Sequence, residues 1–249
     1  MERLNESRIG AVLKEAYAVR AATSMVSTPH AQHGVGLLVG LDSDVTVVEP
    51  GRAPVRGRVL VVPPQLWHSA SCPGPSLGFL YDPQAAPRLA DYSRAPGGAF
   101  PLEGRLAARL GAAMASHRAS LSHPEVLDGL SREAEGWLGK DSSHRELDRR
   151  VARVLEALRD PSVDRRLVLA HSGISQAHLQ ALFVRDVGLP IRTFLLWRRL
   201  LVALAAFSRL DATSAAHLAG FADLAHFSRT CRRMLGYSPT TLRGKLLPA

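Results

Sequence analysis

The chain has 249 residues, of which 46% are hydrophobic, and this length and composition suffice for two domains that each bury a core. Two cysteines argue against a disulfide framework and favour the cytoplasm as the compartment. The charged N-terminus argues against a signal peptide, and the longest apolar run, residues 200–207, is too short to span a membrane. The net charge of +9 favours a polyanionic partner.

The first part of the chain has the pattern of a β-rich domain. Residues 4–18 have the spacing of a short amphipathic helix, and strands are expected from about residue 19 to residue 82. Residues 34–39, 44–49, 58–62 and 76–81 are β-rich runs separated by turn-forming residues. Many short strands with frequent turns predict a small barrel or sandwich.

Three histidines and a tryptophan occur among these strands. They are His30, His33, Trp67 and His68. The surrounding pattern of Pro29-His-Ala-Gln-His, Gly40, Pro63-Pro64 and His68 resembles a cupin-type sensor domain. Histidines of this kind hold transition metals in cupins, but the usual ligand glutamate is not evident here. We therefore expect a barrel without metal or other cofactor, in which the four residues line an effector pocket or its rim; packing inside the barrel is the expected role of Trp67.

Residues 101–138 predict two helices. Leucines and a methionine recur every four positions over residues 102–114, and a second apolar stripe covers residues 127–138. One interpretation is that both helices cover the barrel, and the alternative is that one forms an interface between two copies of the chain. The polar residues 139–143 interrupt the pattern, so we place the domain boundary there and expect domains at residues 1–140 and 141–249.

An internal repeat dominates the second domain. Each copy has a helix-capping residue, core residues four and eight positions later, and a glycine thirteen positions later. The first copy has Ser175, Leu179, Phe183 and Gly188, and the second has Asp223, Phe227, Cys231 and Gly236. The two copies are 48 residues apart. A short helix, a tight turn and a second helix in each copy predict two helix-turn-helix units.

The other helices of this domain are expected around the repeat. They cover residues 147–158, 163–170, 191–207 and 214–219. The helix at 191–207 is apolar nearly all round and would be buried between the two units; at 1.5 Å per residue it is roughly 25 Å long. Recognition helices in successive major grooves lie about 34 Å apart, and this rigid helix together with the two packed units would hold them at that distance.

The positive charge is concentrated in the repeat-containing domain. Residues 1–140 hold 14 basic and 13 acidic residues, a net charge of +1, whereas residues 141–249 hold 17 and 9, a net charge of +8. Since phosphate contacts dominate the affinity of proteins for DNA, this asymmetry favours a nucleic acid as the partner of the second domain.

The repeat resembles the AraC/XylS family of bacterial transcription regulators. The similarity is carried by Ser-Gly-Ile-Ser-Gln-Ala-His-Leu-Gln-Ala-Leu-Phe at 172–183, Ala-Gly-Phe-Ala-Asp-Leu-Ala-His-Phe-Ser-Arg-Thr at 219–230, Gly236-Tyr237-Ser238-Pro239 and Arg243. It implies an α+β protein with an N-terminal cupin-like β-barrel and two helices, and a C-terminal all-α domain of two helix-turn-helix motifs joined by a linker helix. The chain departs from the family pattern at Ala181, Leu224 and Cys231.

The resemblance and the helical spacing together assign the DNA-contacting residues. They are Ser175, Gln176, Ala177, His178, Gln180 and Ala181 in the first unit, and Leu224, Ala225, His226, Ser228, Arg229, Arg232 and Arg233 in the second. Gln180 can bind adenine and Arg229 guanine, each through two hydrogen bonds, although Arg229 could instead contact only phosphate. Arg232 and Arg233, nearer the end of the helix, are expected to contact phosphates.

We therefore expect a sequence-specific, non-enzymatic transcription regulator that binds double-stranded promoter DNA through two adjacent major grooves. The resemblance further implies an activator that contacts RNA polymerase, a homodimer, and control by a small molecule at the barrel. The alternative is a metal-dependent cupin enzyme with a DNA-targeting domain. A nucleoid-type structural binder would leave the barrel without a role.

Overall fold

The computed structural model describes residues 8–13, 17–82, 97–138, 147–158, 173–207 and 209–243. The N-terminal part forms two antiparallel sheets. Their strands are β1 (Arg8–Leu13), β2 (Tyr17–Ala22), β3 (Met25–Val26), β4 (His30–Ala31), β5 (Val35–Gly40), β6 (Val45–Val48), β7 (Val55–Gly57), β8 (Val59–Val62), β9 (Trp67–Cys72), β10 (Ser76–Tyr81) and β11 (Phe100–Pro101). One sheet has the order β1-β2-β10-β5-β8-β11, and the other has the order β3-β9-β6-β7 with β4 paired to β9.

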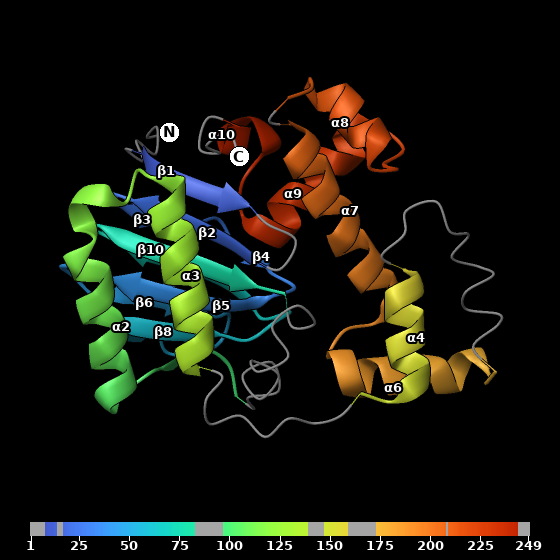
Figure 1. Cartoon of the computed structure of the whole chain (residues 1–249), viewed down its shortest axis with the longest axis horizontal. Coiled ribbons are helices and arrows are strands. Elements are labelled where there is room, and N and C mark those ends of the chain that lie inside the picture. The colour runs from blue at the N-terminus through green and yellow to red at the C-terminus, as the bar shows by residue number, and fades with distance from the viewer. Residues whose placement is uncertain are drawn as a thin grey trace.

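Alternating side chains place one core between the sheets and another under two helices. Leu60 and Val62 of β8 pack with Val45 and Val47 of the smaller sheet, as expected where successive residues point to opposite faces. The helices α2 (Gly104–Ser116) and α3 (Pro124–Leu138) lie across the larger sheet in Figure 1, with the short 3-10 helix η2 (Arg118–Ser120) between them. Their apolar faces cover the barrel, which is the first of the two interpretations given for residues 101–138.

The predicted helix at residues 4–18 is wrong where the structure describes it. Residues 8–13 form β1 and pair antiparallel with β2, with Leu13 opposite Ala18. Hydrogen bonds to a neighbouring strand here outweigh a local helical spacing, because the edge of β2 offers unpaired backbone N–H and C=O groups with which this segment pairs. The barrel therefore begins at about residue 8 and not at residue 19, whereas the predicted strands at 34–39, 44–49, 58–62 and 76–81 are confirmed.

The C-terminal part is helical, as predicted. Its helices are α4 (Arg149–Ala157), α6 (Gln176–Val187), α7 (Ile191–Phe207), α8 (Ala212–Leu218), α9 (Leu224–Leu235) and α10 (Pro239–Arg243). Ser175 and Asp223 cap α6 and α9 through their side chains, and Gly188 and Gly236 end these helices in the left-handed conformation, with φ of 79° and 75°. The capping and terminating residues of both repeats are thereby confirmed.

Each repeat packs around its own apolar cluster. Leu179 and Phe183 of α6 pack with α4 and with the start of α7, and Phe227 and Cys231 of α9 pack with the rest of α7 and with α8. The linker helix is thus shared by both units, and its predicted bounds at 191–207 are confirmed. None of the described helices is long and apolar enough to cross a membrane.

Two expectations fall on residues that the structure does not describe. The proposed boundary between residues 140 and 141 lies between the end of α3 at Leu138 and Leu147, and the predicted helix at 163–170 lies between α4 and residue 173. Both remain predictions.

Cys231 is expected to resist alkylation in the native protein. Its side chain is fully buried, and this burial raises the pKa of the thiol to about 12, so little thiolate forms at neutral pH. Iodoacetamide labelling followed by mass spectrometry should modify Cys231 only after denaturant is added. Rapid labelling of the native chain at this position would show that α9 opens from its core.

Candidate nucleic-acid interface and adjoining cavity

The first recognition helix, α6, presents a small and uncharged face. Ser175 Oγ accepts a hydrogen bond from the backbone N–H of His178 at 3.3 Å and so fixes the first turn. The exposed predicted residues are Ser175, Gln176, Ala177, His178 and Ala181, and Gln180 is half-buried. Val184 was not predicted as a DNA-contacting residue. Its side chain is 41% exposed and lies on the same side of the helix as Ala177 and Ala181.

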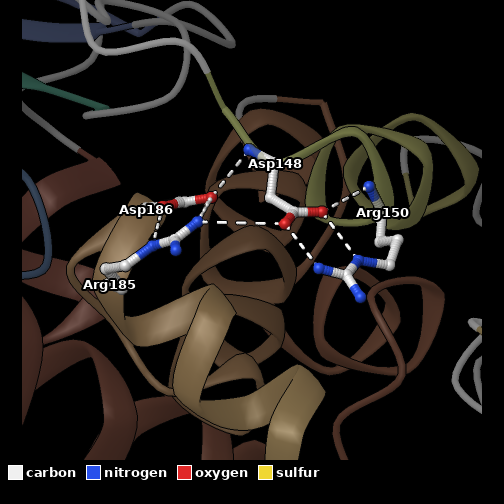
Figure 2. A network of polar contacts seen from close by, with 4 residues as sticks. All are labelled: Asp148, Arg150, Arg185 and Asp186. Atoms are coloured by element: carbon white, nitrogen blue, oxygen red, sulfur yellow. Dashed lines mark hydrogen bonds and ion pairs between the residues drawn. The ribbon is translucent and has the colours of Figure 1, made fainter. Parts of the chain in front are cut away.

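The one basic side chain of α6 is held by acidic neighbours (Figure 2). Arg185 binds Asp186 through two hydrogen bonds, of 2.7 and 3.0 Å, and lies 4.0 Å from the carboxylate of Asp148. Buried Asp186 also accepts from the backbone N–H of Asp148 at 2.8 Å. Arg150 completes the network, and its hydrogen bonds hold the pKa of Asp148 well below the usual range. The network fixes the start of α4 against the end of α6.

The second recognition helix, α9, presents a basic face. Asp223 accepts from the backbone N–H of His226 at 2.5 Å. Among the predicted residues Leu224, Ala225, Arg229, Arg232 and Arg233 are exposed, and Ser228 and His226 are half-buried. The ring of His226 meets Phe221 edge-on, with 5.1 Å between centroids, so this histidine is partly engaged in packing.

The barrel contacts both recognition helices at equivalent points. The Gln65 side-chain amide donates to the carbonyl of Gly188 at 3.2 Å, and the Thr28 hydroxyl donates to the carbonyl of Gly236 at 2.7 Å. These glycines occupy the same place in the two repeats, immediately after α6 and α9. Gly236 lies so close to β4 that an added Cβ would meet His30 Nδ1 at 2.9 Å.

Tyr237 extends the second of these contacts. Arg20 of β2 donates to the Tyr237 hydroxyl at 2.7 Å, and its guanidinium lies 5.1 Å from the centre of that ring. The hydroxyl donates in turn to the carbonyl of Val26 at 3.3 Å. A cation stacked on an aromatic ring and hydrogen-bonded to it gives a directional contact between the two halves of the chain.

A cavity of about 140 Å³ lies at this junction. The barrel and the helical part both contribute to its mainly apolar wall, which includes Val19, Leu38, Leu80, Leu201, Leu235 and Tyr237. Arg20 and Trp197 also line it. The indole Nε1 of Trp197 is buried and has no hydrogen-bond partner among the described residues, so this N–H can donate to a bound group.

The four predicted pocket residues divide between the cavity and its surroundings. His30 and His68 line the cavity, with 4.4 Å between their ring centroids. His33 lies outside its wall and meets Trp197 edge-on. Trp67 is 46% exposed, so the expectation that it packs inside the barrel is wrong. Burial lowers the pKa of His30 and of His33 to about 4, and it lowers the pKa of His68 as well.

Sequence reasoning missed the residues that connect the two halves. Tyr237 belongs to the pattern that carries the family resemblance, but nothing in the sequence relates it to Arg20, which is 217 positions away. The described residues contain no group of three or more His, Cys, Asp or Glu side chains that could hold a metal ion. The histidines instead lie at or beside the junction with the helical part.

Comparison with known proteins identifies the helical domain and the overall architecture. Residues 168–245 match the family model of a helix-turn-helix domain. The structure of ToxT from Vibrio cholerae superposes with a TM-score of 0.57 and 11% identity, over 95% of this chain and 100% of that one. ToxT bound to an unsaturated fatty acid gives 0.55 and 10%, over 96% and 98%. Comparison with the sequences of curated proteins gave no match.

At this identity the likeness to ToxT shows a shared fold, with barrel and helical domain in the same order along the chain. The matched helix-turn-helix model spans both capped recognition helices and the linker helix between them. The chain thus carries a C-terminal helix-turn-helix domain, a kind of domain that binds DNA, behind an N-terminal domain of two antiparallel sheets.

Proposed function

We propose that a small molecule in the cavity between the barrel and α9 controls how the two recognition helices engage promoter DNA. The observation that carries the proposal is the composition of the cavity wall, in which Arg20 of the barrel and Tyr237 of the α9–α10 turn are bonded to each other. A ligand there contacts both halves of the chain. It shifts their arrangement only if it binds one arrangement better than the other.

An apolar carboxylic acid fits the chemistry of this cavity. Its hydrocarbon part would be buried against Leu80, Leu201 and Leu235, and its carboxylate would accept from Arg20 and from the Trp197 indole. ToxT has been crystallised with an unsaturated fatty acid and with (E)-4-(8-methylnaphthalen-1-yl)but-3-enoic acid. Both are apolar acids, which supports the same ligand class for this chain.

The test measures binding of a series of unsaturated fatty acids to the full chain. Binding is monitored by intrinsic tryptophan fluorescence and by the midpoint of thermal unfolding. We expect the acids to raise the midpoint of unfolding and the matched alcohols to raise it less, because an alcohol cannot form an ion pair with Arg20. Arg20→Gln should remove the difference between acid and alcohol. Equal binding of acid and alcohol to the native chain would contradict the ligand class.

The DNA contacts follow from the two exposed helix faces. We propose that Gln180 and Arg229 contact bases in adjacent major grooves, and that Arg232 and Arg233 contact phosphates. Selection of bound duplexes from a random library, with and without the acids, would supply the operator and show whether the ligand changes its affinity. No enrichment of any sequence would contradict the proposed function.

Arg232→Ala is expected to weaken operator and scrambled duplex almost equally, because a phosphate contact carries no sequence information. The slope of log affinity against log salt should fall by about 0.9 for the single lost contact. Gln180→Ala is the matched control: it should cost roughly 1–3 kcal/mol on the operator and little on scrambled DNA. If Gln180→Ala weakens both duplexes to the same extent, α6 is not a base-contacting helix.

Assembly and transcriptional output belong to the same proposal. We propose that the chain acts in the cytoplasm as a homodimer through the outer faces of α2 or α3, and that it activates by contacting RNA polymerase without catalysing a reaction itself. Exposed alanines on α2, including Ala108 and Ala112, leave room for a second helix. Sedimentation equilibrium of the native chain and of Ala112→Arg tests the dimer, which the arginine should disrupt if α2 forms the interface.

A further inference from the structure

The face of α6 that would enter the groove is chemically unlike that of α9. Residues of a groove-bound helix that contact bases recur at positions i, i+3, i+4 and i+7. In α6 these positions hold Ala177, Gln180, Ala181 and Val184; in α9, 48 residues later, they hold Ala225, Ser228, Arg229 and Arg232. The last two positions are therefore Ala and Val in the first unit and Arg and Arg in the second.

Among the residues that the structure describes, the charged side chains of α6 do not add charge to the face that would enter the groove. Arg185 is bonded to Asp186 and lies next to Asp148 (Figure 2). Val184 is 41% exposed, although the rest of its helix buries its large apolar residues. Val184 therefore adds an exposed apolar side chain to this face, where it can contact an apolar group of a bound duplex.

The major groove offers one apolar group, the C5-methyl of thymine. Alanine and valine can contact this methyl but can neither donate nor accept a hydrogen bond with any base. Gln180, between them, can bind the N6 and N7 atoms of adenine. Arginines at the matched positions of α9 bind guanine or phosphate instead.

We infer that Ala181 and Val184 make α6 a reader of thymine methyl groups, so that the half-site under the first unit contains A·T pairs while the second unit supplies the charged contacts. This inference rests on the proposed function, since it presupposes that α6 enters the major groove. It assigns Val184 as a specificity-determining residue.

The experiment replaces each thymine of the library-selected operator by deoxyuridine, which removes the methyl group and leaves base pairing intact. Binding is measured by fluorescence anisotropy with the full chain. We expect about a fourfold loss of affinity for each contacted methyl removed, from the transfer free energy of one methyl-sized group. Val184→Ala should bind the thymine operator more weakly and should no longer distinguish deoxyuridine at one position.

Two variants serve as controls. Val184→Thr keeps a methyl group at nearly the same shape and should retain part of the discrimination. Arg232→Ala, at the matched position of α9, should lower affinity for thymine and deoxyuridine operators by the same factor. Because Val184 is exposed, Val184→Ala should unfold at the midpoint of the native chain, which thermal unfolding monitors.

The outcomes separate this inference from the function on which it rests. Tight binding to a selected operator with no deoxyuridine effect in either half-site, or with an effect that Val184→Ala leaves unchanged, overturns the methyl-contact assignment alone. Failure of the native chain to prefer any duplex overturns the proposed function together with it.

Discussion

Phe227→Ala is expected to lower the free energy of unfolding of the helical domain by about 3–5 kcal/mol, the usual cost of removing a buried phenylalanine side chain. Phe227 is fully buried and lies between two other rings, with centroid distances of 5.3 Å to Phe221 and 6.3 Å to Phe207. These rings connect α9 to the linker helix and to the turn of the second unit. Urea unfolding followed by circular dichroism measures the loss.

Leu224→Ala is the matched control for this substitution. Leu224 also lies on α9, three positions earlier, but its side chain is 38% exposed. Its replacement should therefore change stability little. A small loss for Phe227→Ala, similar to that of the control, would show that α9 does not pack on α7 as described.

Stability is also expected to fall as the pH falls below about 6.5. Burial lowers the pKa of His30 and His33 from 6.5 to about 4, with His68 and Arg20 near the first ring and Arg233 near the second. The unfolded chain therefore takes up protons first as the pH decreases. At about pH 5.5 the two histidines together should cost about 3 kcal/mol, and their contribution should level off below about pH 4, where both rings are protonated in the folded chain as well.

Urea unfolding between neutral pH and about pH 5 measures this dependence. His33→Gln should make the curve flatter, because one buried titrating ring is removed. An unaltered slope in His33→Gln would show that this ring does not contribute to the pH dependence.

The sequence predicted the helical domain more fully than the barrel, and the reason lies in the range of the interactions. The caps Ser175 and Asp223 and the glycines Gly188 and Gly236 act on neighbouring backbone groups, so their spacing is visible in the sequence. The strand β1 depends on hydrogen bonds to β2 that a local pattern does not reveal. It was therefore predicted as a helix.

The cavity could not be predicted for the same reason. Histidines at positions 30 and 68 were recognised as pocket residues, but the opposite wall comes from α7 and from the α9–α10 turn. Nothing in the sequence distinguishes Trp197 from the other apolar residues of the linker helix. Its unpaired indole nitrogen, which bears most directly on the ligand, becomes visible only when burial and hydrogen bonding are known.

The hydrogen bonds from Gln65 to Gly188 and from Thr28 to Gly236 constrain the length of α7. One residue inserted in a helix turns everything beyond it by about 100° and advances it by about 1.5 Å. After such an insertion the barrel could keep its bond to one repeat but not to the other. The number of residues in α7 is therefore constrained by the distance between two side chains of the barrel, and an insertion in this helix should be tolerated less well than one in a loop of the domain.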